Sequence, residues 1–275
     1  MGAPRTPNFR MRQLGRTLRR LREQAGLNQN EVGDRLRFSN SKMSRVEQGR
    51  LSNYHEFLAL LDLYGVIVAD YNEYLTIFDR ANEKGWWRAY GLDDRGFVSI
   101  EADASVVRNY ELGFVPGLLQ TETYIRNSFA TARVPLRGER LENQIAVRLR
   151  RQLRLTEEPR LTVHALIDES VLRRPICDPG QLRAIAQRAA LPNVTVRVLP
   201  NDATAHGGLY SNFIVVNFPD AAEPGLAYVE YGFGSVEIEQ EQEVRAARLL
   251  FDHLTDLALS ERDSLALVEQ LATGT

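Results

Sequence analysis

Two short helix-forming segments within residues 26–50 constrain this 275-residue chain more than any other feature of its sequence. Asn28 can cap the first helix, because its side-chain oxygen can accept a backbone N–H, and Glu31 can complete a capping box. Ser39 is a second N-cap three residues after the first helix, and Gly49 is a natural stop for the second. The spacing predicts two capped helices joined by a short turn.

One side of the second predicted helix is polar throughout. Met43 and Val46 form its apolar side. The polar side chains follow helical spacing and form one stripe of hydrogen-bonding groups: Asn40, Ser41, Ser44, Arg45 and Gln48. Such groups can bond the base edges or phosphates of double-stranded DNA. The stripe therefore predicts a surface that reads the major groove.

Two flanking segments can close a small helical core around this pair. Apolar residues at helical spacing occur before it and after it, at Leu14, Leu18 and Leu21 and at Phe57, Leu60, Leu61 and Tyr64. The alternative is a generic helical bundle whose charged residues only solvate its surface.

Residues 14–66 closely resemble the helix-turn-helix domain of Xre-type phage repressors, in helix lengths, in Asn28-Gln29-x-Glu31 and in Val46-Glu47-x-Gly49-Arg50. The resemblance implies that Gln29 and Arg50 contact DNA phosphates, and that Arg22 pairs with Glu47 to join the first helix to the recognition helix. We assign base reading to Asn40, Ser41, Ser44 and Arg45, and phosphate contacts to Gln29, Lys42, Gln48 and Arg50.

The charge of the chain is unevenly distributed. Residues 1–54 hold 12 Lys and Arg against 4 Asp and Glu, whereas the whole chain has 34 against 36 and a net charge of −2. A basic segment supplies the attraction to phosphate that dominates nucleic-acid affinity, and an acidic body suits other partners. The single cysteine excludes an intramolecular disulfide and a cysteine-based zinc site, and no apolar run suits a membrane span. We expect a cytoplasmic protein without membrane contact, metal or cofactor.

The length leaves room for a second core. We expect a multidomain chain with an all-α, lambda-repressor-like helix-turn-helix domain and an α+β C-terminal domain with a mixed sheet. Residues 1–10 are expected to be a flexible arm, residues 11–68 the DNA-binding domain, residues 69–84 a connecting helix, and residues 85–275 a regulatory and dimerisation domain.

In the larger part of the chain, the spacing of apolar residues changes after residue 160. A helix is predicted over residues 100–111, and another from Gly138 to about Glu158. Short β-branched runs follow, with a helix between the first two and two helices at the end. The predicted strands cover residues 161–167, 194–199, 213–218, 226–230 and 236–238.

Several strings in this part resemble the C-terminal, antitoxin-like domain of actinobacterial WhiJ-like regulators. They include Gly85-Trp86-Trp87, Ile167-Asp168-Glu169, Leu191-Pro192-Asn193-Val194 and His206-Gly207-Gly208-Leu209. The resemblance implies a transcriptional regulator that acts with a small protein encoded nearby.

Few residues suggest catalysis. Asp168 and Glu169 follow a predicted strand, but capping the next turn or pairing with Arg173 is the favoured interpretation. Four arginines on one predicted helix are expected to form surface pairs with the acidic body: Arg148, Arg150, Arg151 and Arg154. We expect that the chain is not an enzyme.

Three functions remain open at this point. The first, which we favour, is a DNA-binding regulator, repressor or antitoxin-like, whose second domain forms a homodimer and docks a small protein. The second is a transcription factor that senses a small-molecule ligand near Trp86, Trp87 and His206. The third is an enzyme fused to a DNA reader.

Overall fold

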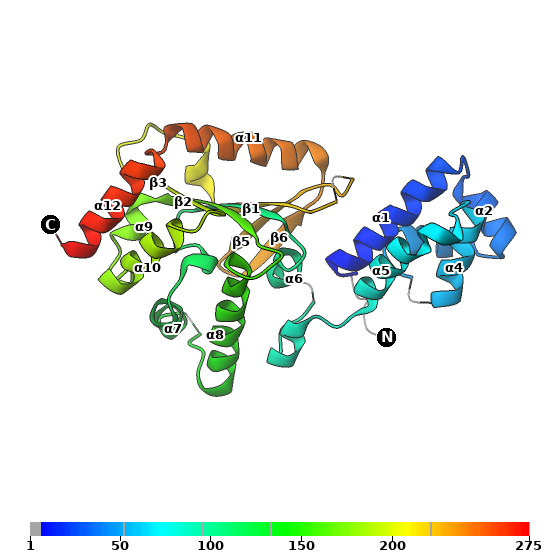
Figure 1. Cartoon of the computed structure of the whole chain (residues 1–275), viewed down its shortest axis with the longest axis horizontal. Coiled ribbons are helices and arrows are strands. Elements are labelled where there is room, and N and C mark those ends of the chain that lie inside the picture. The colour runs from blue at the N-terminus through cyan, green and yellow to red at the C-terminus, as the bar shows by residue number, and fades with distance from the viewer. Residues whose placement is uncertain (1–6, 52, 95, 133, 221, 275) are drawn as a thin grey trace. The chain divides into compact units, whose positions relative to one another are not determined.

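The computed structural model describes residues 7–274 except 52, 95, 133 and 221, and it divides into two compact units, one ending at Ser99 and one beginning at Ile100 (Figure 1). The expected division at residue 85 stays a prediction. None of the described helices is long and apolar enough to cross a membrane.

The first unit is entirely helical. Its helices are α1 (Phe9–Gln24), α2 (Gln29–Leu36), α3 (Asn40–Glu47), α4 (Tyr54–Leu63) and α5 (Tyr71–Asn82), with short 3-10 helices η1 (Val68–Asp70) and η2 (Trp86–Tyr90). Leu14 and Leu18 of α1 share one buried core with Met43 of α3 and Phe57 of α4, and Phe78 of α5 closes it. The apolar residues that recur at helical spacing therefore face the core, as expected for amphipathic helices.

The expected flexible arm is wrong for the residues that the structure describes. Residues 1–6 lie outside the described part. Asn8 caps α1 by accepting a hydrogen bond from the Met11 N–H (2.9 Å), and Phe9 is only 2% exposed. Residues 8–10 thus belong to the packed domain, because the cap satisfies a backbone donor that helix formation leaves without a partner.

The second unit contains a six-stranded mixed sheet with the strand order β3-β2-β1-β4-β5-β6. Strands β1 (Val106–Glu111), β2 (Thr162–Asp168) and β3 (Val194–Leu199) are parallel. Strands β4 (Phe213–Asn217), β5 (Leu226–Tyr231) and β6 (Gly234–Ile238) continue the sheet antiparallel. The expected α+β architecture with a mixed sheet is confirmed.

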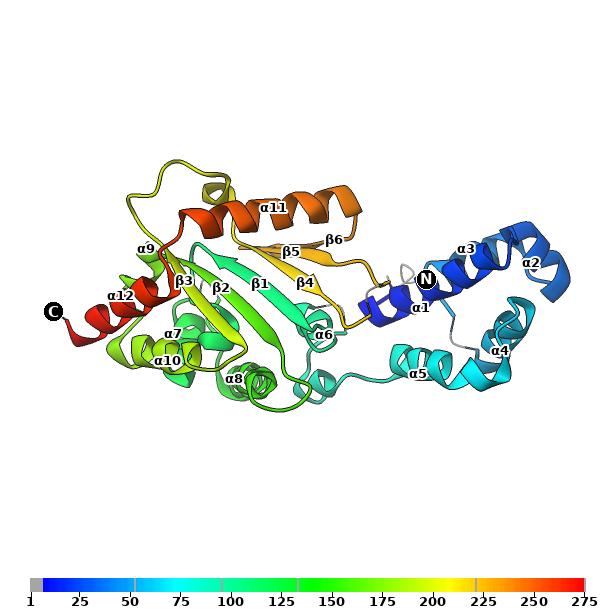
Figure 2. The same cartoon turned by 45° about the horizontal axis from the view of Figure 1, so that its top comes forward.

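Helices cover both faces of this sheet (Figure 2). Helix α11 (Glu241–Leu257) lies on one face, where Phe251 and Leu254 pack on Tyr110 and Phe213. Helices α7 (Glu122–Ala130), α8 (Gly138–Gln152) and α10 (Pro179–Ala189) lie on the other face, and α12 (Glu261–Thr273) packs on α10 and β3. Parallel strands need such crossover helices. The remaining elements are α6 (Phe97–Glu101), α9 (Glu169–Leu172) and the 3-10 helices η3 (Gly117–Leu119), η4 (Leu153–Leu155) and η5 (Gly207–Tyr210).

Two predictions for this unit are wrong. Residues 100–111 are not one helix: α6 ends at Glu101, and Val106–Glu111 form β1 in the middle of the sheet. Pairing with β2 on one side and β4 on the other outweighs the helix propensity of the preceding Glu and Ala residues.

The arginines of α8 do not form a surface cluster. Arg151 forms a bidentate ion pair with Glu101, with both N···O distances 2.7 Å, and Arg154 donates to the backbone carbonyls of Ala102 (2.9 Å) and Ala104 (2.8 Å). Only Arg150 of the four is exposed. The predicted helix beginning at Gly138 is present, but the acidic partner of Arg151 lies 50 residues away in sequence.

Candidate nucleic-acid interface

The turn between α2 and α3 is set by two N-caps. Asn28 Oδ1 accepts from the Glu31 N–H (3.0 Å), and a Glu31 carboxylate oxygen accepts from the Asn28 N–H (2.7 Å), which completes the capping box. Ser39 Oγ accepts from the Lys42 N–H (3.2 Å) at the start of α3. Between them Arg37 has φ 55°, a left-handed conformation that ends α2. These local bonds fix the helix-turn-helix.

The outer face of α3 is polar and accessible. Asn40, Ser41 and Arg45 are exposed, as is Gln48 at the helix end. Their hydrogen bonds stay within this segment: Arg45 Nε donates to the Ser41 carbonyl (3.1 Å) and Gln48 Nε2 donates to Ser44 Oγ (3.1 Å). Side chains that make only exposed, local hydrogen bonds can replace them with hydrogen bonds to base edges at little cost in free energy.

The inner face of α3 anchors it. Met43 and Val46 are 0% and 1% exposed in the core of the first unit. The helix ends at Glu47, Gly49 follows with φ 86°, and the Arg50 N–H donates to the Arg45 carbonyl (2.9 Å). Arg50 therefore lies beyond the end of the helix and is exposed. A phosphate contact made by Arg50 would be separate from the exposed polar face of α3.

A buried ion pair joins α1 to α3, as the resemblance implies. Arg22 Nε lies 2.5 Å from one Glu47 carboxylate oxygen and Nη2 lies 3.3 Å from the other. Arg22 Nη1 also donates to the Leu27 carbonyl (2.7 Å). The hydrogen bond to Glu47 raises the pKa of Arg22 above its ordinary value despite partial burial. The pair therefore sets the position of α3 on the domain.

Glu47 has a further partner in Gln29, whose Nε2 donates to the second carboxylate oxygen (2.8 Å). Gln29 is thus hydrogen-bonded to the last residue of α3 in the free protein. Its assignment to a DNA phosphate stays a prediction. Sequence reasoning missed this bond, since residues 18 apart give no local signal.

Lys42 lies on a different side of α3 from the exposed stripe. Its ammonium is 2.6 Å from a Glu56 carboxylate oxygen of α4 and 3.8 Å from the centre of the Phe38 ring. A phosphate contact by Lys42 requires this pair to open, so the assignment stays a prediction.

Comparisons with known families agree with this geometry. A helix-turn-helix domain model matches residues 13–71, which makes the first unit the DNA-binding part of a regulator. A second model, described as Domain of unknown function (DUF5753), matches residues 94–270. The chain belongs to the DUF5753 family. No curated protein and no solved structure gave a significant match.

In this DUF5753 chain the residues first considered for catalysis have structural partners. Asp168 caps α9 by accepting from the Ser170 N–H (3.0 Å), and Glu169 accepts from Arg173 Nε (2.7 Å) and from the Asn201 N–H (2.9 Å). The favoured interpretation of both residues is confirmed. Among the described residues, no group of His, Cys, Asp and Glu is arranged to hold a metal ion. That the chain is not an enzyme stays a prediction.

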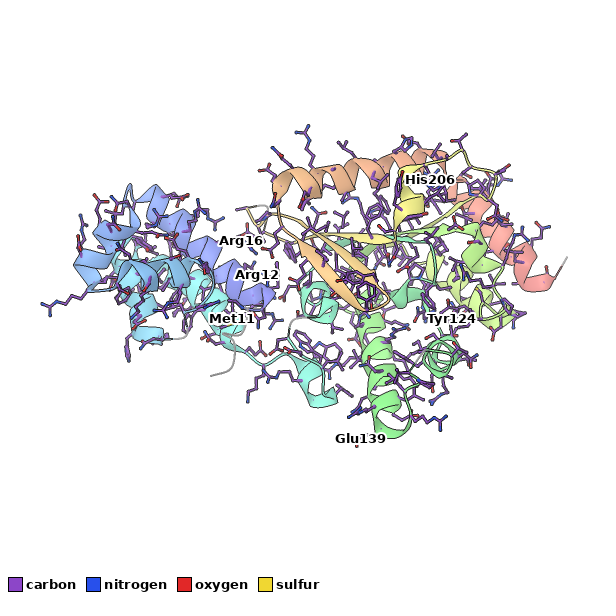
Figure 3. All side chains as sticks on the ribbon, turned by 180° about the vertical axis from the view of Figure 1, so that it is seen from behind. Met11, Arg12, Arg16, Tyr124, Glu139 and His206 are labelled. Atoms are coloured by element: carbon purple, nitrogen blue, oxygen red, sulfur yellow. The ribbon has the colours of Figure 1, made fainter. Side chains whose placement is uncertain are left out.

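The residues named for a ligand or partner belong to different units of this family member. Trp87 is 1% exposed and its Nε1 donates to Asp94 (2.9 Å), within the first unit. Trp86 packs edge-on against Trp87 and Tyr90. His206 lies in the second unit, just before η5, which packs on α11 (Figure 3). A ligand site involving these three residues stays a prediction.

Proposed function

We propose that this chain is a sequence-specific transcriptional regulator that binds a near-palindromic operator as a homodimer and is modulated by a small protein partner. The DNA-binding part of this proposal rests on the exposed polar face of α3, which the Arg22–Glu47 pair joins to α1. Phosphate contacts position such a domain, and base contacts from Asn40, Ser41 and Arg45 specify the sequence.

The dimer follows from the small size of one reading surface. A single recognition helix touches few base pairs, so a unique genomic site needs two linked domains about 34 Å apart, one helical turn of DNA. In the first unit the leucines of α1, together with Met43 and Val46, are buried in the core and are not available for pairing. We therefore assign dimerisation to the second unit.

Exposed apolar side chains of the second unit support association through it. Phe233 is 94% exposed at the turn between β5 and β6, with Tyr231 at 42% and Val236 at 45% beside it in sequence. Because β6 is an edge strand, its outer backbone groups are also open to another chain. The resemblance to WhiJ-like regulators supports a small partner encoded nearby, and this surface suits such a partner.

The test is selection of binding sites from random DNA by the intact chain, with sedimentation equilibrium on the same sample. We expect an enriched inverted repeat and a dimer. An asymmetric site bound by a monomer would contradict the proposal. Co-expression with the adjacent small gene product tests the partner: Phe233→Ser should abolish co-purification, and Leu153→Ser, at another exposed apolar residue, is the matched control and should not.

A further inference from the structure

The β5–β6 hairpin ends the sheet with an exposed edge. Strand β6 is the last strand, and its register with β5 runs from Gly234 to Ile238 without a bulge. All residues from 230 to 236 are exposed. Edge strands pair readily with other chains, and bulges, prolines or a covering segment usually prevent this. Strand β6 contains neither a bulge nor a proline, so its exposed part can accept another strand.

The backbone groups of Ser235 point away from β5. Tyr231 and Gly234 close a two-residue turn, so they form a hydrogen-bonded pair of the hairpin. Hydrogen-bonded and non-hydrogen-bonded pairs alternate along an antiparallel ladder. Ser235, opposite Glu230, is therefore in a non-hydrogen-bonded pair, and its N–H and C=O face outward. These are the groups to which a further strand would bind.

The two faces of the hairpin differ in chemistry. Residues opposite each other in a ladder share a face, and successive residues of a strand alternate between faces. Val236 lies opposite Val229, which packs on the apolar core under α11, so Val236 is on the α11 side. Glu237 lies opposite Tyr228, which interacts electrostatically with Arg151 of α8, so Glu237 is on the α8 side.

The α11 side of the hairpin is apolar. Tyr231 and Val236 are both exposed on this side. Phe233 in the turn is exposed as well, and its ring centre lies 4.6 Å from that of Tyr231. A strand that pairs with β6 and carries apolar side chains on this side covers part of this surface, and the burial of apolar area favours its binding.

The hairpin and the residues after it are acidic. Residues 230–243 contain five glutamates and no Lys, Arg or His, and the first basic residue that follows is Arg245. Arg148 and Arg151 of α8 interact with Glu230 and balance part of this charge. The other four glutamates occupy every second position from 237 to 243, and those at 241 and 243 are exposed. This segment therefore attracts a basic partner and repels a second copy of itself.

Given the proposed function, on which this inference rests, we propose that β6 binds an extended segment of the small protein partner as an added strand. Apolar residues of that segment lie on the α11 side and alternate with Lys or Arg on the α8 side. In such strand addition the backbone hydrogen bonds supply affinity, and the alternating side chains supply specificity. A second copy of this chain is not the occupant, because pairing two acidic edges brings like charges together. The homodimer therefore uses another surface of the second unit.

The experiment measures the fluorescence anisotropy of three labelled peptides of equal length, each titrated with the intact chain. The first peptide alternates valine and lysine, the second alternates valine and glutamate, and the third is the first with its valine nitrogens methylated. We expect only the first to bind. The glutamate peptide tests the sign of the charge. The methylated peptide keeps the positive charge but lacks backbone donors, so it separates strand addition from general attraction of a cation.

Ser235→Pro tests the edge from the side of the protein. Proline is tolerated in an edge strand where its missing N–H would face solvent, so this variant blocks pairing while the bonds to β5 remain. We expect the valine–lysine peptide to bind it about tenfold more weakly or worse. Ser235→Thr keeps the N–H and is the matched control. Circular dichroism checks folding, and if Ser235→Pro fails to fold, the methylated peptide decides the question, because only the peptide is changed.

Three results would overturn the proposal: no binding of the valine–lysine peptide, equal binding of either other peptide, or dissociation of the dimer by Ser235→Pro. The last result would show that a second copy pairs with β6. A chain that selects an operator and dimerises but binds no peptide contradicts this inference and leaves the DNA-binding function standing. A chain that binds the peptide but selects no operator contradicts the proposed function alone.

Discussion

Gly15 of α1 lies directly against Glu47 at the end of α3, so that a Cβ atom on Gly15 would be 2.4 Å from the Glu47 carbonyl oxygen and 2.6 Å from the Gly49 nitrogen. Only a residue without a Cβ atom allows the two backbones to approach this closely. The Arg22–Glu47 pair, about two turns further along α1, depends on the same approach. The recognition helix is therefore positioned by a backbone contact together with an ion pair.

We predict that Gly15→Ala destabilises the first unit by about 1–3 kcal/mol or more, because rigid backbone atoms have to move apart. Thermal denaturation of the intact chain, followed by circular dichroism, measures the loss. Gly96→Ala is the control, since a Cβ there meets nothing within 4 Å. Equal melting temperatures for the two variants would rule out the close packing of α1 on α3.

Glu47→Ala should destabilise the chain by about 3–5 kcal/mol, since it leaves a largely buried Arg22 without its carboxylate. Glu23 also approaches Arg22 (3.5 Å) but its side chain is 52% exposed, so solvent screens the pair and Glu23→Ala should cost far less than Glu47→Ala. Urea denaturation of both variants provides the comparison. A loss at Glu23 as large as that at Glu47 would contradict the assigned pair.

Arg45→Ala should relax base preference at one position of each half-site and cost about 1–3 kcal/mol of specific binding, because Arg45 lies on the exposed stripe of α3. Arg50→Ala should weaken all sequences alike, because Arg50 lies beyond the helix end. Site selection with both variants separates the two effects. Uniform weakening by both would show that Arg45 does not read bases.

The Lys42–Glu56 pair offers a test of the phosphate assignment. Glu56→Gln removes the carboxylate that holds the Lys42 ammonium at 2.6 Å, and should strengthen DNA binding with a salt dependence steeper by about one ion. Combining it with Lys42→Met should remove the gain. Binding measured by fluorescence anisotropy at several salt concentrations decides this, and an unchanged salt slope in Glu56→Gln means that Lys42 does not contact phosphate.

Stability should fall as the pH rises towards 8.5. Folding raises the pKa of Glu111 from its ordinary 4.5 to about 8, so the folded state holds a proton that the unfolded state releases between these values. This contribution is present below the unfolded pKa and is lost as the pH passes the folded pKa, at up to about 1.4 kcal/mol per pH unit. Glu111→Gln should flatten the melting temperature between pH 5 and 8.5 relative to Glu139→Gln. An unaltered slope would mean that Glu111 is ionised in the folded chain.

The sequence by itself determined the elements whose signals are local. Asn28 and Ser39 each cap a helix through the amide three residues further on, and the apolar spacing of Leu14, Leu18 and Leu21 selects the buried face of α1. The β-branched runs from Val194 onward likewise predicted strands of a mixed sheet. Each of these signals is complete within a few residues, so no distant partner is needed to read it.

Only the tertiary structure decided which polar side chains are paired within the chain and which are exposed. Gln29 and Lys42 are held by carboxylates 18 and 14 residues away, and Arg151 is buried because Glu101, 50 residues earlier, is there to receive it. Strand β1 replaces a predicted helix because β4, more than 100 residues later, pairs with it. The burial and pairing of these residues depend on contacts between segments that are far apart in the sequence. The residue pattern of one segment therefore does not indicate which distant residue will be its partner.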